Sequence, residues 1–141
     1  MNNYRSLKEV KRAIQSGKTT CLSLTKSYLK RIHKNKELNA FLEVFEEEAL
    51  NSARIIDEKI IAGTAGRLAG MVIGIKDNIC YKGHVVTAAS RILNGFESMF
   101  SATAVDRLLM EDAIIIGRLN CDEFAMGSSN ENSAYGPTLN P

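Results

Sequence analysis

A lysine, an aspartate and an asparagine follow an apolar run in the middle of the chain. Residues 68 to 75 read LAGMVIGI, and Lys76, Asp77 and Asn78 come next. Burying charged groups beside an apolar segment costs free energy unless the charges are paired, neutralised or used. Lys76 is therefore either a salt-bridged or snorkelling residue, or an amine whose desolvation favours the neutral form that can accept a proton. The second interpretation predicts general-base chemistry.

Two short apolar segments are expected to position this lysine. MVIGI, residues 71 to 75, and AIIIG, residues 113 to 117, are rich in β-branched residues and predict strands covered on both faces, as in a parallel sheet. A helix beginning at residues 103 to 106 separates them. This order predicts a right-handed crossover and an α/β fold. The loops after both strands then share one edge of the sheet, where ligands of open α/β sheets usually bind.

The first third of the chain predicts helices. Ser6 and Glu9 have the spacing of a capping box, and Gly17 is placed to end the helix that starts there. Thr19 or Thr20 can cap a second helix. That helix is expected to turn three regularly spaced side chains inward: Leu24, Tyr28 and Ile32.

A short strand and a third helix are expected next. Residues 39 to 45 contain strand-forming side chains, and the acidic residues 46 to 48 suit the start of a helix because of its dipole. We therefore divide the chain into an amino-terminal helical region, residues 1–66, and the start of an α/β core, residues 67–141.

Composition narrows the classes of protein. The 141 residues are 45% hydrophobic and 24% charged, which is typical of one globular domain. No apolar run reaches the roughly 18 residues that span a bilayer, and the start lacks the apolar centre of a secretory signal, which predicts a cytoplasmic protein with no membrane contact. The three cysteines lack metal-ligand spacing, so reduced thiols and no metal are expected.

Charge is distributed unevenly along the chain. The net charge is +2, yet residues 1 to 40 hold ten lysines and arginines against two glutamates. Such a segment can face nucleic acid or an acidic partner, because clustered cations raise the local potential. It lacks the interleaved aromatic residues of a base-stacking surface, so a solvated helix face or a partner-protein surface is favoured.

Two long motifs resemble a known family. LAGMVIGIKDN, residues 68 to 78, and CDEFAMGSSNENSAYGPTLNP, residues 121 to 141, resemble the amidase signature family, and most closely the A subunits of its aspartyl/glutamyl-tRNA(Asn/Gln) amidotransferases. The resemblance implies a serine, cis-serine, lysine triad with Lys76 as the base, acting on glutamine to release ammonia. It implies no cofactor in this chain. The B subunit is implied to use ATP and Mg to amidate misacylated tRNA, and the C subunit to steady the amidase chain.

The resemblance also assigns weaker roles. Met126, Gly127 and Ser128 correspond to a loop on the substrate side of the family's cleft, although a glycine-permitted turn capped by hydroxyls explains them as well. Asp77 and Asn78 are expected to hold the lysine loop by hydrogen bonds rather than to react. Asp122 and Glu123 suggest a helix start. His33 and His84 have no partner at metal or catalytic spacing.

The family's two serines correspond to positions beyond Pro141, so we expect an amino-terminal fragment that is inactive and marginally folded alone. The serines present at positions 128, 129 and 133 do not match the nucleophile. Two other hypotheses stay open: a non-catalytic assembly module that contacts the C subunit, or an amidase acting on another amide.

Overall fold

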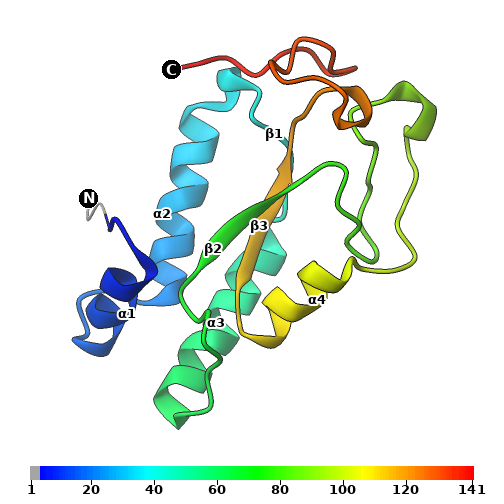
Figure 1. Cartoon of the computed structure of the whole chain (residues 1–141). Coiled ribbons are helices and arrows are strands. Elements are labelled where there is room, and N and C mark those ends of the chain that lie inside the picture. Colours follow the sequence, from blue (N-terminus) through cyan, green and yellow to red (C-terminus); the bar gives the residue numbers. More distant parts are fainter. Residues whose placement is uncertain (1–3) are drawn as a thin grey trace.

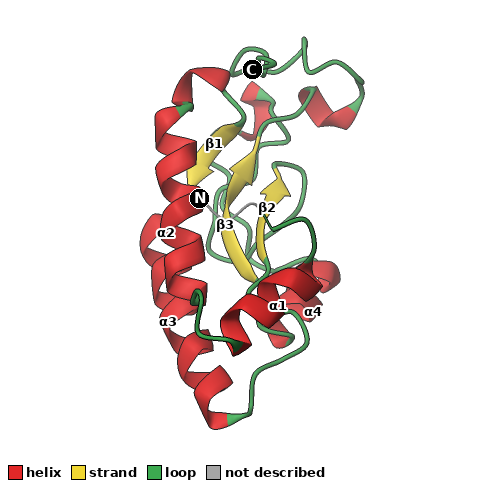
Figure 2. Cartoon of the chain, turned by 90° about the vertical axis from the view of Figure 1, so that its left-hand side faces the viewer, coloured by secondary structure: helices red, strands yellow, loops and turns green. Residues whose placement is uncertain are grey.

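A mixed α/β arrangement is seen in the computed structural model, which describes residues 4–141 (Figure 1, Figure 2). The predicted helices and strands are confirmed. In chain order they are α1 (Leu7–Gln15), α2 (Cys21–Lys34), β1 (Phe41–Val44), α3 (Glu46–Ala62), β2 (Val72–Lys76), α4 (Thr103–Met110) and β3 (Ile114–Leu119).

Strand β3 is the centre of the sheet. The strand order is β1-β3-β2, with β2 parallel to β3 and β1 antiparallel to it. The expected coverage of both strands is correct for β3, whose Ile114 to Arg118 are buried, but wrong for β2, which is half-buried over most of its length. Strand β2 has a neighbour on one side only within the described residues, so its outer edge is open.

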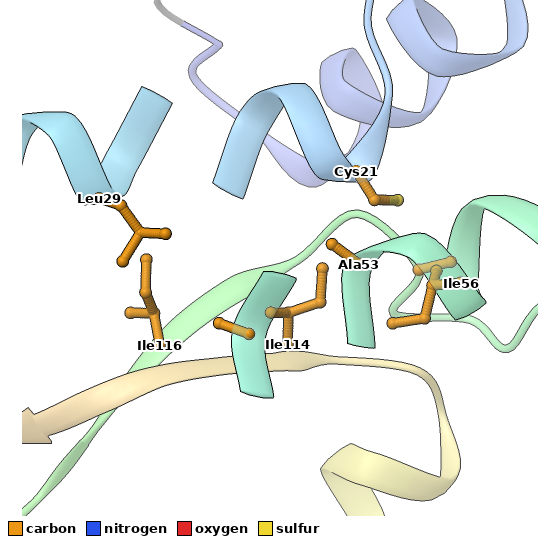
Figure 3. Packing of buried hydrophobic residues seen from close by; sticks show 8 residues of the cluster. Cys21, Leu29, Ala53, Ile56, Ile114 and Ile116 are labelled. Carbon is orange, nitrogen blue, oxygen red and sulfur yellow. The ribbon is translucent and has the colours of Figure 1, made fainter. Parts of the chain in front are cut away.

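The sheet is packed on both faces. Because side chains alternate along a strand, Ile114 and Ile116 of β3 face α2 and α3, while Ile115 faces α4. The first face contains the larger cluster, which joins Leu29 of α2 to Ala53 of α3 (Figure 3). The region before residue 66 and the region after it therefore share one core.

The ends of the first two helices follow the predicted chemistry. The Oγ of Ser6 accepts from the amide of Glu9 at 3.2 Å, and Gly17 ends α1 in the left-handed region at φ 71°. The Oγ1 of Thr20 accepts from the amide of Ser23 at 3.0 Å. The sequence does not show that the Asp57 carboxylate of α3 also accepts from the first amides of α2, at 2.7 and 3.0 Å.

The inner face of α2 differs from the prediction at one position. Tyr28 is 37% exposed, whereas Leu29 is 3% exposed and takes the expected inward place. Each step of four residues advances about 40° around a helix, so a spacing of four drifts off the buried face.

Gly117 permits the close pairing of β1 and β3. A Cβ at this position would lie 2.4 Å from the carbonyl oxygen of Glu43. We expect Gly117→Ala to lower the free energy of unfolding by about 1–3 kcal/mol, because backbone atoms must move apart. Urea denaturation measures this. Val72→Ile, which adds one methylene at a half-buried position of β2, is the control, and an equal effect of both would contradict the explanation.

Candidate functional site

Lys76 is the last residue of β2, and its backbone pairs with Leu119 of β3. Its side chain is exposed, whereas the neighbouring Ile75 and Asp77 are 5% and 0% exposed. The apolar residues before Lys76 therefore do not desolvate it within the described chain, because they point alternately into the two faces of the sheet. The amine projects from a fixed backbone into open space at the carboxyl edge of the sheet.

The two loops expected to meet at this edge do meet. The amide of Asp77 donates to the carbonyl of Leu119 at 3.0 Å, which joins the start of one loop to the start of the other. Burial raises the pKa of the Cys121 thiol, and the nearby charges of Asp77 and Lys76 act on it in opposite directions. The lysine is thus electrostatically close to the second loop.

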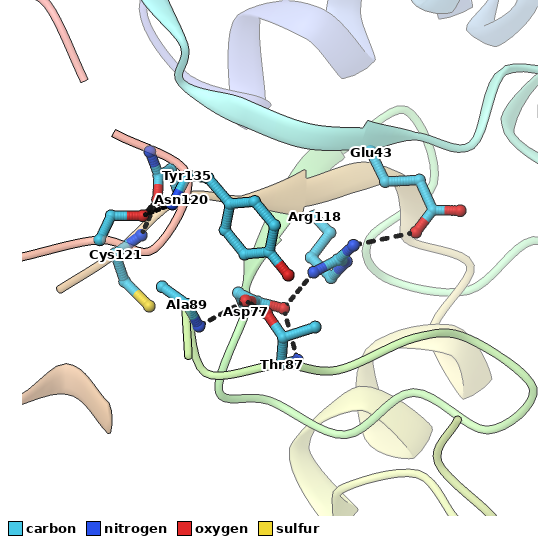
Figure 4. Close-up of polar contacts among 9 residues, drawn as sticks. Glu43, Asp77, Thr87, Ala89, Arg118, Asn120, Cys121 and Tyr135 are labelled. Carbon is cyan, nitrogen blue, oxygen red and sulfur yellow. Dashed lines mark hydrogen bonds and ion pairs between the residues drawn. The ribbon is translucent and has the colours of Figure 1, made fainter. Parts of the chain in front are cut away.

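Asp77 is the most heavily bonded side chain near Lys76 (Figure 4). One carboxylate oxygen accepts from the amide of Thr87 at 3.0 Å and from the guanidinium of Arg118. The other accepts from the Thr87 hydroxyl at 2.5 Å and from the amide of Ala89 at 2.7 Å. A buried carboxylate requires such partners, so Asp77 is held as an anion that ties β2 to the turn at residues 86–90.

The turn held by Asp77 has a backbone that alanine rarely adopts. Ala88 and Ala89 are both left-handed, at φ 49° and 51°, and both are buried. Their carbonyls accept from the amides of Phe124, at 2.8 Å, and Ala134, at 2.9 Å. Consecutive residues of this kind persist only where surrounding contacts impose them. Asp77 therefore organises the second loop as well as the first.

Asp122 organises the second loop from within. Its carboxylate accepts from the amides of Asn130, at 2.8 Å, and Asn132, at 3.0 Å. The expected helix start at Asp122 and Glu123 is only a short 3-10 turn, and the Asp122 side chain does not cap it. Gly127 packs directly on this carboxylate, since a Cβ there would lie 2.4 Å from Asp122 Cγ.

The remaining candidates lie on the surface. Met126 is 87% exposed, and Gly127, Ser128 and Asn78 are also exposed. Met126 and Ser128 extend from the loop that Asp122 holds, so they are accessible to a ligand. Their roles stay predictions.

Acid should loosen this loop. The amides of Asn132 and Asn130 hold the pKa of Asp122 below its ordinary value of 3.8. A lowered pKa in the folded state stabilises the loop above that value, and the contribution is lost as pH falls through the folded pKa. We expect faster hydrogen exchange at the Asn130 and Asn132 amides, relative to other amides, below about pH 4.

Asp122→Asn supplies the comparison for this measurement. The variant lacks the titrating group, so its loop exchange is expected to be already fast at pH 6 and to show no added step in acid. An identical acid step in both proteins would contradict the role of Asp122.

The histidines lie apart from Lys76. His33 is within 3.3 Å of Glu46, and His84 is within 3.0 Å of Glu48 and stacks on Tyr81. Within residues 4–141, the His, Cys, Asp and Glu side chains form no group of three or more suited to a metal ion. In the same range no helix has the length and apolar character needed to cross a membrane.

Comparison with known proteins decides the family. The amidase family model matches residues 23–141. The chain belongs to the amidase family. As an amidase-family chain it has the confirmed fold class, the amino-terminal helices and first strands of a mixed sheet. It is 51% identical to the A subunit of glutamyl-tRNA(Gln) amidotransferase from Chlorobium phaeobacteroides (strain DSM 266 / SMG 266 / 2430) over 99% of its own length. It is 46% identical to the protein of that name from Salinibacter ruber, over 98%.

Solved structures agree with the amidase assignment. One, from a study of a vestigial protein complex and the origins of an s-triazine catabolic enzyme, matches 98% of the chain with a TM-score of 0.89 and 32% identity, and 31% of that structure is covered. Native peptide amidase from Stenotrophomonas maltophilia matches 95% with a TM-score of 0.83 and 28% identity, and 29% of it is covered. The chain spans 29% of the Chlorobium relative and 27% of the Salinibacter relative.

Proposed function

We propose that the complete protein containing this chain is the amidase subunit of a tRNA-dependent amidotransferase and hydrolyses glutamine. The 51% identity to an amidotransferase A subunit over 99% of this chain carries the proposal. Peptide amidase shares the fold at only 28% identity, so the fold alone does not select the substrate. Sequence similarity favours the amidotransferase over an amidase for another amide.

In this proposal Lys76 is the base of a serine, cis-serine, lysine triad. The neutral amine accepts a proton from the bridging serine, which accepts one from the nucleophilic serine as that oxygen attacks the glutamine amide carbon. The carbon–nitrogen bond breaks, the returning proton leaves with ammonia, and an acyl-enzyme remains. Water then hydrolyses the ester to glutamate. The exposed position of Lys76 at the sheet edge leaves room for both serines, which we assign to a segment outside this chain.

The proposed partners follow from the same relatives. Ammonia passes to the B subunit, which uses ATP and Mg to amidate Glu-tRNA(Gln) or Asp-tRNA(Asn), and the C subunit steadies the amidase subunit. The exposed amine and loop described above belong to the ammonia-releasing step only. We place the complex in the cytoplasm.

Purified complete protein with its B and C subunits tests the proposal. We expect ammonia release from glutamine, and conversion of Glu-tRNA(Gln) to Gln-tRNA(Gln) with ATP present. Asparagine and a peptide amide serve as competing substrates. Release from the peptide amide but not from glutamine would support the other-amide alternative, and assembly without any amide hydrolysis would support the non-catalytic module.

The basic amino-terminal segment is predicted to contact protein rather than tRNA. Lys30, Lys34 and Lys36 are exposed at the end of α2 and just beyond it. Reversing all three to glutamate should weaken subunit assembly and change tRNA affinity by less than about threefold, because surface cations act mainly on the partner they face. Analytical ultracentrifugation and tRNA filter binding measure the two effects.

A matched variant controls for net charge. Three exposed cations outside the basic segment are reversed instead: Lys82, Arg91 and Arg107. A large loss of tRNA affinity in the first variant only, with assembly unchanged, would show that the segment binds tRNA.

A further inference from the structure

Arg118 is a buried cation next to the proposed base, and the sequence gives no direct sign of its role. It lies on β3, where its backbone pairs with Ile75, one residue before Lys76. Its side chain is 9% exposed. One guanidinium nitrogen donates to Asp77, and another lies 3.3 Å from a carboxylate oxygen of Glu43.

The bonding of Arg118 is incomplete for a purely structural ion pair. Its Nε is buried and has no hydrogen-bond partner among the described residues. Buried ion pairs with unmet hydrogen bonds are often no more stable than well-packed apolar residues of similar size. Stability alone therefore does not explain a guanidinium at this position.

Its position relative to Lys76 suggests what the charge does. Asp77 follows Lys76 directly, and a carboxylate beside a lysine favours the protonated amine, which cannot act as a base. Arg118 supplies the opposite charge to that carboxylate. It also fixes Asp77, whose backbone carbonyl accepts from the amide of Ala88 at 2.9 Å and whose amide bonds Leu119. Both the charge and the orientation of the Lys76 backbone depend on this pair.

We propose that Arg118 is a positioning residue for the proposed base Lys76, acting through Asp77 by fixing its carboxylate and balancing its charge. The inference rests on the proposed amidase function. Arg118 contacts neither the amine nor the substrate in this role. Glu43 holds the other side of the guanidinium and keeps it directed along the sheet.

Arg118→Met in the complete protein tests the proposal. The rate constant kcat for ammonia release from glutamine should fall about 10- to 100-fold, as for other groups that hold a reacting side chain. The acid limb of the pH–rate profile should move up by about one pH unit, because the uncompensated Asp77 favours protonated Lys76. KM for glutamine should change less than about threefold, since no binding contact is removed.

Three further variants separate positioning from stability. Arg118→Met combined with Asp77→Asn removes both charges, so its acid limb should return to the parental pH. Arg118→Lys retains the charge and should keep the parental limb, and it carries the test if Arg118→Met does not fold. Arg107→Met, an exposed arginine of α4, should match the parent.

The outcomes are distinct. An active parent whose Arg118→Met variant keeps both kcat and the acid limb overturns the inference alone. A displaced limb in Arg118→Lys also overturns it. A parent that releases no ammonia from glutamine removes the proposed function, and this inference with it.

Discussion

Replacing Lys76 with alanine in the complete protein is expected to lower kcat for ammonia release from glutamine by about 10²- to 10⁴-fold, the usual contribution of a general base. Lys76→Arg should fail as well, because guanidinium stays protonated at any working pH. The fold should be unaffected. The side chain is exposed at the end of β2, and surface truncations of this kind change stability by no more than about 0.5 kcal/mol.

Lys82→Ala is the matched control for this prediction. Lys82 is also exposed, and it lies in the loop that follows the same strand. Its truncation should leave ammonia release unchanged. Near-parental turnover by Lys76→Ala, with the same melting temperature, would exclude Lys76 as the base.

The largest expected effect on stability is that of Asp77→Ala. The change leaves the buried Arg118 without its anion and removes the acceptor of the Thr87 and Ala89 amides. Breaking a buried ion pair on one side costs about 3–5 kcal/mol. Chemical denaturation of the complete protein measures the loss. Hydrogen exchange at Phe124 and Ala134 should rise with it, because their acceptors lie in the turn that Asp77 holds.

Two variants make this result specific. Asp77→Asn keeps an oxygen acceptor but not the charge, so its loss should be intermediate. Asp106→Ala removes an exposed aspartate of α4 and should change stability by less than about 0.5 kcal/mol. A loss below about 1 kcal/mol for Asp77→Ala, the ordinary size of a point substitution, would contradict the described network.

The elements were predictable because their signals are local. Apolar spacing located α3 and α4, and β-branched runs located β2 and β3. The parallel crossover then implied that the loop after Lys76 lies beside the loop after Leu119, which the ladder confirms. Thus the candidate edge of the sheet could be found before any coordinates.

The network around Asp77 could not be predicted in the same way. It depends on the register that sets Ile75 against Arg118, and on two left-handed alanines whose conformation is imposed by tertiary contacts. A charged residue directly after AIIIG was the available signal for Arg118. The loop role of Asp122 was hidden because an acidic residue before a short polar stretch equally predicts a helix cap.

The strand order has a consequence for synthesis on the ribosome. Strand β3 is the last of the three strands in the chain, yet both others pair only with it, and Val44 meets Gly117. Until β3 has emerged, β1 and β2 lack their partner, and their open edges can bind other chains. Domains are made vectorially at about 5–20 residues per second, so the nascent chain waits several seconds between β1 and β3. Helices α2 and α3, which pack on each other, are available to cover the apolar surface during that interval.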